Sequence, residues 1–468
     1  MQSFDLQADG SYLGQNGDFA SLSLNETGTY TLTEPDGTAT VFNSDGKIDY
    51  IQDTNGNRIT TTYSDENLTN LTDSFGNSLS FEYNSDGRIT TVTDSDGRTT
   101  NYGYDETGEL LTSVTDEAGT TTYTYDGFAV ASITDPNGTT IEFTYDDRGR
   151  LAQQSISGGE VITYSYGEAG EVTVTDELGN QTELLLNQNG QVGRLTDANG
   201  RLINFSYDNQ GNLTEILAPD NNSTVFNYDD RGNVTSQIDA AGNTIEFTYD
   251  PTYNQLTGFS DPLGNGINYT YDEAGNLETI NYGDGSSETF DYNDNGDVTV
   301  SANRRGQEIL YSYNDQGQLI SQINPDAETP IGYTYDARGN LDTVTSDTGT
   351  IALDYDESDR LTKITYPEGR SLAYTYDAGG RRTSMTDQDG KQVNYSYDDA
   401  GRLGSLTDGK GDLIVSYQYD EVGRLAREDK GNGTYTQYSY DLAGQLLSIE
   451  NYAPITPSIP VLSILMTI

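Results

Sequence analysis

Aromatic and polar residues alternate in short stretches that recur along most of the chain. In the segment YSYDDAGRLGSL, which begins at residue 395, Tyr395 and Tyr397 lie two residues apart. Residues with that spacing share one face of a β-strand, and the Ser between them suits the opposite face. The pattern predicts a strand that ends at its second aromatic residue and has one aromatic and one polar face.

Turn signals follow each aromatic stretch. Asp398 opens and Gly401 closes an Asp-x-x-Gly turn, because Asp accepts bonds from nearby backbone N–H groups and Gly adopts positive φ. A second turn of this kind, such as Asp387 to Gly390, separates successive copies. Turns every ten residues or so leave strands of about six residues and no room for a helix of ordinary length. We therefore predict an all-β fold, a long antiparallel sheet of about 40 short strands built from hairpin repeats.

Apolar residues two and five positions after the turn Gly, such as Leu403 and Leu406, do not fit a flat strand. Residues three apart on a regular strand point to opposite faces. Either a β-bulge resets the alternation, or both faces of the sheet are partly covered. The sequence leaves both alternatives open.

The second aromatic residue recurs at steps of 20 to 22 residues, nearly always 21. Leu186 fills the one gap in this series, and Phe42 and Leu24 extend it toward the N-terminus. Such a repeat indicates one extended array. The series consists of Tyr63, Tyr83, Tyr104, Tyr125, Tyr145, Tyr166, Tyr207, Tyr228, Tyr249, Tyr271, Tyr292, Tyr313, Tyr335, Tyr355, Tyr376, Tyr397, Tyr419 and Tyr440.

Three regions follow from this series. Residues 1–23 are predicted to be pre-repeat strands that cap the first edge, residues 24–449 the repeat array, and residues 450–468 a tail that is disordered or truncated. The residues that we expect to define the repeat structurally are Tyr104, Asp105, Gly108, Tyr145, Asp146, Gly149, Tyr376, Asp377, Gly380, Tyr397, Asp398 and Gly401.

The composition is strongly acidic, with 75 acids, 23 bases and a formal net charge of −52. Such a surface repels phosphate backbones and anionic membranes, so we expect no nucleic-acid partner. A disordered acidic polymer is the alternative, but disordered segments are poor in aromatic residues and this chain has 36 Tyr in fixed phase. No apolar stretch is long enough to cross a membrane, so we expect no membrane insertion, and no signal peptide is visible.

Catalytic and cofactor chemistry finds little support. The chain has no Cys and no His, which excludes Cys nucleophiles, His-dependent triads and the usual zinc and haem ligand sets. Paired carboxylates such as Asp146-Asp147 and Asp229-Asp230 recur at equivalent turns, which favours a structural role. We predict no enzyme activity, no metal site and no cofactor, although Asp-x-Asp-Gly turns leave weak surface Ca²⁺ binding open.

Two further side-chain types have alternative roles. The Tyr rows are typical of cross-strand packing, with stacking on sugars as the functional alternative. Arg residues after the turn Gly are predicted to pair with acids of neighbouring turns along the sheet edge. These are Arg88, Arg98, Arg150, Arg402 and Arg424.

The motif aromatic-x-Tyr-Asp-x-x-Gly-x-Leu, repeated over residues 24–449, resembles the YD repeats of the RHS family. That resemblance implies a sheet that curves into a spiral, open shell-like array with one face toward a cavity. Bacterial members commonly enclose a C-terminal toxin, and teneurins use a similar shell for adhesion. The family's self-cleavage motif has Asp-Pro-x-x-Gly; here Asp261-Pro-Leu-Gly264 lies in an ordinary turn, so no protease role is carried over.

The sequence thus favours a non-enzymatic scaffold of a secreted or surface protein, which encloses or presents a protein partner. A carbohydrate- or cell-surface-binding adhesin is one alternative, and exposed Tyr rows would favour it. The remnant of a polymorphic toxin whose enzymatic C-terminus is missing is the other. The secreted or surface location rests on the family resemblance alone.

Overall fold

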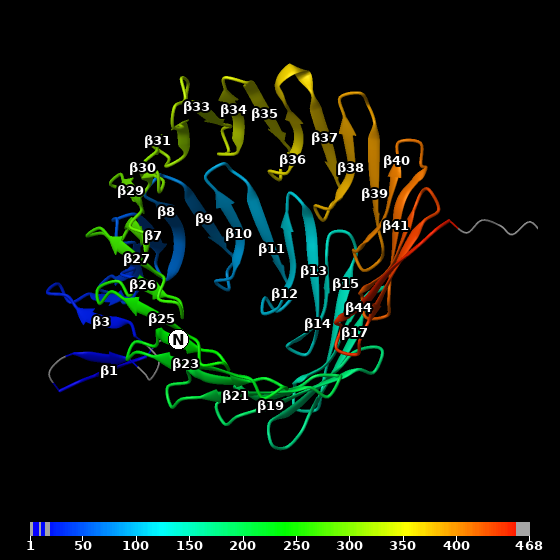
Figure 1. The fold of residues 1–468 in the computed structure, drawn as a ribbon, viewed down its shortest axis with the longest axis horizontal. Helices are drawn as coiled ribbons and strands as arrows, with labels where there is room; N and C mark the ends of the chain where they lie inside the picture. The colour runs from blue at the N-terminus through cyan, green and yellow to red at the C-terminus, as the bar shows by residue number, and fades with distance from the viewer. Residues whose placement is uncertain (1–2, 9–10, 15–18, 455–468) are drawn as a thin grey trace, which may run out of the picture. The chain divides into compact units, whose positions relative to one another are not determined.

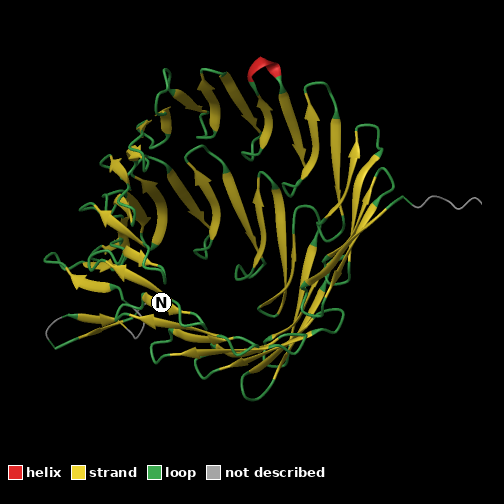
Figure 2. Cartoon of the chain, viewed as in Figure 1, coloured by secondary structure: helices red, strands yellow, loops and turns green. Residues whose placement is uncertain are grey.

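A computed structural model describes residues 3–8, 11–14 and 19–454 (Figure 1). In these residues the chain is all-β apart from one short 3-10 turn, η1 (Pro367–Gly369), as Figure 2 shows. Strands β3 to β44 form a single antiparallel sheet of 42 strands, and no pairing among the described residues joins β3 to β44. The predicted fold class is confirmed, and the sheet is open.

The strands alternate in type along the chain. Most odd-numbered strands carry the aromatic-x-Tyr pattern, with β3, β5, β7, β19 and β35 as exceptions, and even-numbered strands carry the apolar residues that follow the turn. The odd-numbered strands are β3 Ser21–Leu24, β5 Ala39–Phe42, β7 Arg58–Ser64, β9 Ser78–Tyr83, β11 Thr99–Tyr104, β13 Gly119–Asp126, β15 Thr140–Tyr145, β17 Val161–Tyr166, β19 Gln181–Leu186, β21 Leu202–Tyr207, β23 Ser223–Tyr228, β25 Thr244–Tyr249, β27 Gly266–Tyr271, β29 Ser287–Tyr292, β31 Glu308–Tyr313, β33 Ile331–Tyr335, β35 Gly349–Tyr355, β37 Ser371–Tyr376, β39 Gln392–Tyr397, β41 Leu413–Tyr419 and β43 Tyr435–Tyr440. The even-numbered strands are β4 Tyr30–Thr33, β6 Ile48–Gln52, β8 Asn67–Asp73, β10 Ile89–Asp94, β12 Leu111–Asp116, β14 Ala129–Thr134, β16 Leu151–Ile156, β18 Glu171–Thr175, β20 Val192–Thr196, β22 Leu213–Leu217, β24 Val234–Ile238, β26 Leu256–Ser260, β28 Leu277–Tyr282, β30 Val298–Ala302, β32 Leu319–Ile323, β34 Leu341–Ser346, β36 Leu361–Thr365, β38 Arg382–Asp387, β40 Leu403–Asp408, β42 Leu425–Lys430 and β44 Leu446–Tyr452.

The two ends of the chain differ from the array. Strands β1 (Phe4–Leu6) and β2 (Tyr12–Gly14) pair with each other in a separate two-stranded sheet. The Tyr12 ring meets the Tyr30 ring of β4 edge-on, with 5.8 Å between the centroids. At the other end β44 continues to Tyr452, into the predicted tail of residues 450–468, and residues 455–468 of that tail lie outside the described residues.

A β-bulge settles how the apolar residues share one face. Between β39 and β40 the register runs Ser396↔Ser405 and then Tyr397↔Leu403, so one residue of β40 is left over at the shift. Leu406 opposes Tyr395, and Leu403 opposes Tyr397. The bulge therefore resets the alternation and brings residues three apart onto one side, which we call the aromatic face.

The hairpin of β17 and β18 lacks the bulge and provides a comparison. Its apolar residues, Val172 and Val174, are two apart, and they oppose Tyr166 and Tyr164 without any register shift. The bulge is present where the apolar spacing is three and absent where it is two. The spacing of the apolar residues after the turn thus reports the bulge directly.

The sheet is a single layer, and this limits burial. Among the described residues only Gly258, Ser384, Val415 and Thr436 are buried. Aromatic-face side chains are half-buried, because they pack against the next strand and against no second layer. Lateral contacts between neighbouring hairpins must therefore provide most of the stability.

Two compact units make up the chain. Unit 1 comprises Met1–Thr120, Leu185–Leu195 and Leu202–Gly369, and unit 2 comprises Thr121–Leu184, Thr196–Arg201 and Arg370–Ile468. In unit 1 the strands form two rows, which we call tiers. Strands β8 to β12 belong to the first tier and β33 to β36 to the second, and the two tiers run side by side in Figure 1.

Candidate functional site

In most Tyr-Asp turns, the Asp carboxylate bonds the backbone of its own turn. Asp146 Oδ1 accepts the backbone N–H groups of Arg148 and Arg150, both at 2.9 Å, and Asp146 Oδ2 accepts Arg150 Nε at 2.8 Å. The Arg150 guanidinium and these N–H groups lower the pKa of Asp146. Gly149 closes the turn with φ of 75°. Backbone atoms and one side chain thus occupy both oxygens of this carboxylate.

The other predicted repeat positions occupy equivalent places. The Asp105, Asp377 and Asp398 carboxylates each accept the backbone N–H of the residue four positions later. Asp105 also accepts the backbone N–H five positions later. Gly108, Gly380 and Gly401 have φ of 74°, 83° and 80°. The Tyr104, Tyr145 and Tyr397 hydroxyls bond backbone carbonyls, and Tyr376 lies opposite Arg382 at the register shift.

The hydroxyl of the second aromatic residue connects neighbouring hairpins, a feature that the sequence reading missed. It donates to the carbonyl of the residue at the preceding bulge, as Tyr397 does to Arg382 and Tyr271 to Leu256. Donor–acceptor distances are 2.6–3.0 Å. We call this series the tyrosine ladder, and its donors are Tyr83, Tyr104, Tyr145, Tyr166, Tyr207, Tyr228, Tyr249, Tyr271, Tyr292, Tyr313, Tyr335, Tyr355, Tyr397, Tyr419 and Tyr440.

Replacing one ladder hydroxyl tests this role. Tyr271→Phe keeps the ring but leaves the Leu256 carbonyl without its 2.6 Å donor. A net hydrogen bond of this kind is worth about 1 kcal/mol, so we expect the free energy of unfolding to fall by that amount. Tyr269→Phe, on the same strand, is the matched control, because neighbouring strands carry Phe247 and Phe290 at that position. Equal losses in the two variants, measured by denaturant titration, would contradict the ladder.

The ladder also predicts sensitivity to alkaline pH. Burial raises the pKa of Tyr249, Tyr271, Tyr292 and Tyr313, and nearby acids add to the effect. Their pKa is higher in the folded chain than the unfolded value of about 10, so their contribution is complete below pH 10 and is lost as the pH rises through the folded values. We expect the melting temperature to fall steeply above about pH 10. Tyrosinate absorbance that develops fully before any loss of the circular dichroism signal would contradict this expectation.

The Arg residues pair differently from the prediction. Arg150, Arg402 and Arg424 contact the Asp of their own turn, four residues earlier, at 2.7–2.8 Å, and not the acid of a neighbouring turn. The Arg402 guanidinium then lies over the ring of Tyr419 in the next odd strand, at 4.5 Å from its centroid. Arg88 follows Asn84 and bonds it through its backbone N–H. For Arg150, Arg402 and Arg424 the prediction was wrong, because Asp and Arg four residues apart meet across the tight turn.

Side chains of the turns join the two tiers within unit 1. Asn55, in the turn before β7, exchanges two amide hydrogen bonds with Asn276, at 3.1 and 2.8 Å. Asn57 Nδ2 donates to the Asn295 carbonyl at 2.9 Å. The second kind of turn, before β7, therefore meets the Tyr-Asp turns before β28 and β30, so the first tier extends back to β7 and the second to β28. We call this line of contact the unit 1 seam.

Charged and aromatic side chains continue the unit 1 seam. Arg98 contacts Asp94 of its own turn and also forms an ion pair with Asp359 of the second tier. The Phe75 ring lies 3.0 Å from the place that a Cβ on Gly317 would occupy. The absence of a side chain at this turn thus makes room for an aromatic ring from the other tier.

Unit 2 contains an equivalent line of contact, the unit 2 seam. Asn137 accepts the Gly379 N–H through Oδ1 at 2.9 Å, and Asn199 Nδ2 donates to Asp441 Oδ2 at 2.8 Å. Both pairs are 242 residues apart, which equals about 11.5 repeats of 21 residues. The extra half repeat arises because, at the unit 2 seam, a turn of the second kind meets a Tyr-Asp turn, and the two kinds lie half a repeat apart in the sequence.

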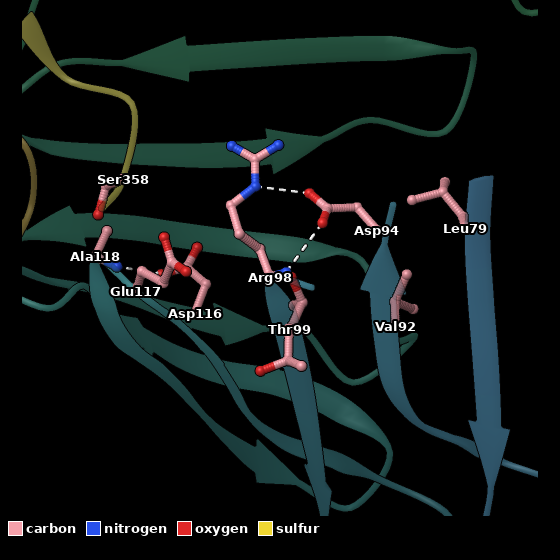
Figure 3. A pocket seen from close by; sticks show the side chains of 10 residues that line it. Leu79, Val92, Asp94, Arg98, Thr99, Asp116, Glu117, Ala118 and Ser358 are labelled. Carbon is pink, nitrogen blue, oxygen red and sulfur yellow. Dashed lines mark hydrogen bonds and ion pairs between the residues drawn. The ribbon is translucent and has the colours of Figure 1, made fainter. Parts of the chain in front are cut away.

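A shallow polar pocket lies at the unit 1 seam (Figure 3). Its volume is about 340 Å³, and Arg98 and Asp94 face each other at its rim, joined by a 2.6 Å ion pair. Ser358 reaches the pocket from the second tier, opposite Glu117 and Ala118 of the first. This pocket can hold water or a small polar molecule, but it has no nucleophile paired with a base.

The described part of the chain has neither a metal-binding cluster of acidic residues nor a membrane-spanning helix. No group of three or more Asp or Glu residues there is arranged to hold a metal ion. In the Asp-x-Asp-Gly turn at Asp94, that carboxylate accepts Arg98 and two backbone N–H groups. None of the helical residues described is part of an apolar segment that could cross a membrane.

Repeated Tyr-Asp hairpins in an open sheet define a YD-repeat β-array. The family model of the teneurin YD-shell matches residues 152–367 and 295–451, and the family model of the RHS repeat matches residues 65–100, 83–120 and 129–160. The teneurin YD-shell match alone spans more than half of the chain. The chain belongs to this family of RHS-repeat proteins, as the sequence predicts. A comparison with curated protein sequences finds no significant match.

Solved structures with the same fold come from toxin complexes. The TcdB2-TccC3 structure matches 97% of this chain at 15% identity with a TM-score of 0.52, and the TcdB2-TccC3-Cdc42 structure matches 96% at 16% identity with a TM-score of 0.55. The Tc holotoxin pore of Photorhabdus luminescens matches 96% at 16% identity, also with a TM-score of 0.55. The chain spans only 28–30% of the length of these structures.

Proposed function

We propose that this chain is a non-enzymatic wall element of an RHS-type β-shell that encloses or presents a protein partner. The observation that carries the proposal is the seam in each unit, where turns of two tiers interlock. An extended single sheet would form without such contacts, whereas a wall requires them to close the space between its tiers. Three pockets along the unit 1 seam have volumes of about 340–550 Å³, far smaller than a folded domain.

The identity of the partner is drawn from the relatives. One solved relative is described as TcdB2-TccC3 without its hypervariable C-terminal region, so that protein carries a variable segment beyond its shared part. By analogy, the partner of this chain is a protein segment such as a C-terminal toxin. A secreted or cell-surface location belongs to the same proposal.

The adhesin alternative has less support. It needs Tyr rings and hydroxyls that are free to meet a glycan, but fifteen Tyr hydroxyls in the described residues already donate to backbone carbonyls. The Arg150, Arg381, Arg402 and Arg424 guanidinium groups also cover ladder rings. The toxin-remnant alternative concerns the gene beyond residue 468, and sequencing the downstream frame distinguishes it.

Protease protection tests enclosure. An unstructured, protease-sensitive reporter is fused after Ile468 of the full chain, and its cleavage rate is compared with that of the free reporter. We expect a reduction of at least about tenfold if the wall shields the reporter. A matched fusion carries Asn137→Ala and Asn199→Ala, which remove two contacts of the unit 2 seam and should restore part of the cleavage. Cleavage at the rate of the free reporter in the unaltered chain would refute enclosure by this chain.

A further inference from the structure

The last strand of the sheet has one unpaired side. β44 pairs with β43 from Tyr440↔Leu446 to Tyr435↔Tyr452, and no other described strand pairs with it. Its sequence, LLSIENY, contains neither Pro nor Lys, the residues that commonly protect an exposed edge. Its one charged residue, Glu450, lies beyond Leu446 and Ile449, so the segment from Leu446 to Ile449 contains no charge and no Pro that would prevent another strand from adding to it.

Apolar side chains are unusually exposed along this strand. Leu446, Leu447 and Ile449 keep 50%, 67% and 53% of their surface exposed. The equivalent residues of an interior strand, Leu403 and Leu406, are half-buried because the next odd-numbered strand covers them. The exposure at β44 is what the loss of one neighbouring strand produces.

An acceptor of the tyrosine ladder also stands open at β44. The Leu425 carbonyl, at the bulge of β42, accepts the Tyr440 hydroxyl at 2.8 Å. Leu446 occupies the same position two residues after Gly444, opposite Tyr440 at the register shift. No described side chain donates to the Leu446 carbonyl. An added strand could satisfy it by placing a Tyr where the array would place the next one.

We propose that the outer edge of β44 is a docking site for an antiparallel β-strand of the pattern aromatic-x-Tyr, contributed by another polypeptide. The hydroxyl of its second aromatic residue donates to the Leu446 carbonyl, and the two aromatic rings cover Leu446 and Ile449. We call this surface the edge site. It adds a partner surface to the chain and does not depend on enclosure.

Two nearer occupants fit the edge site less well. Residues 455–468 of this chain contain no aromatic residue, and Pro454 passes beside Gly433 of the preceding turn. A second copy would offer its first array strand, β3, which has Leu24 where the ladder has Tyr. Neither contains the Tyr whose hydroxyl donates to the equivalent carbonyls of the interior strands.

A labelled peptide with the sequence of residues 433–441 supplies the pattern for the test, because it contains β43 with Tyr438 and Tyr440. Its binding to the full chain is followed by fluorescence anisotropy. A second peptide has Phe in place of Tyr440 and should bind about fivefold more weakly, the equivalent of one hydrogen bond. Ile449→Lys should abolish binding, whereas Leu442→Lys, at an equally exposed Leu in the turn before β44, should not.

The outcomes separate clearly. Binding that weakens with the Phe peptide and disappears only in Ile449→Lys supports the edge site. Equal affinity for both peptides overturns the assignment of the Leu446 carbonyl, and the absence of binding overturns docking. If neither peptide binds, hydrogen exchange shows whether residues 455–468 already protect β44, and light scattering shows whether a second copy does. Both variants must keep the circular dichroism spectrum of the unaltered chain.

Discussion

Gly401→Val is expected to lower the free energy of unfolding of the β39–β40 hairpin by about 2 kcal/mol. Gly401 has φ of 80°, in the left-handed region that costs a residue with a side chain about 1–2 kcal/mol and a β-branched residue more. A Cβ there would also lie 3.1 Å from Arg381 Nη1. Hydrogen exchange of the β39 and β40 amides, together with thermal melting, measures the loss.

Two control variants make this test specific. Gly401→Asn should cost much less, since the chain itself places Asp359 and Asn254 at equivalent turn positions with φ of 57°. Gly332→Val should have little effect, because Gly332 is a strand residue without positive φ and without a neighbour within 4 Å of its Cβ position. An unchanged melting curve for Gly401→Val would contradict the turn assignment.

Asp229→Ala should destabilise the β23–β24 hairpin by about 1–2 kcal/mol, whereas Asp230→Ala should have almost no effect. Asp229 Oδ1 accepts the N–H groups of Arg231 and Asn233, and its Oδ2 accepts Asn233 Nδ2, all at 2.9 Å. Removing the carboxylate leaves the two backbone N–H groups to solvent, while Asn233 Nδ2 keeps its second acceptor, Asn254 Oδ1. Asp230 is exposed, and its replacement by Ala removes the same charge. Comparing the two variants therefore distinguishes the loss of the turn hydrogen bonds from the change in net charge.

The pH dependence of the two variants provides a second readout. Burial alone would raise the pKa of Asp229, but hydrogen bonds from Asn233 and Arg231 outweigh it and lower the pKa. The folded value lies below the unfolded one, so its contribution is present above about pH 4 and is lost as the pH falls further. The difference between Asp229→Ala and the unaltered chain should therefore shrink in acid. Equal melting temperatures for Asp229→Ala and Asp230→Ala at neutral pH would contradict the role of the turn carboxylate.

The strands and turns could be predicted because the signals are local. A turn Asp and its Gly are three residues apart, and two aromatic residues on one strand are two apart, so a short window contains the whole cause. The bulge could not be predicted from the sequence, because apolar residues three apart are compatible with either a bulge or a sheet covered on both faces. The hairpin with Val172 and Val174 shows that the spacing reports the bulge, but only the register settles the matter.

The tyrosine ladder and the seams depend on positions that no local window contains. Tyr397 reaches a carbonyl 15 residues earlier in another hairpin, and Asn137 meets Gly379 across 242 residues. One signal for the ladder was present in the sequence. The first aromatic position admits both Phe, as at Phe247, and Tyr, whereas the second is Tyr from residue 63 onward except at Leu186. The seams have no such signal, because their offset depends on twist accumulated over many strands.

The single-layer sheet has a consequence for the heat capacity of unfolding. That quantity grows with the apolar surface that becomes hydrated, and for ordinary domains it is about 12–15 cal/mol/K per residue. Here almost every described side chain already touches water in the folded state. The heat capacity change per residue should fall below the usual range, and calorimetry can measure it. The stability curve would then be flat, so cooling would destabilise the sheet little and cold would not be a route to unfolding it.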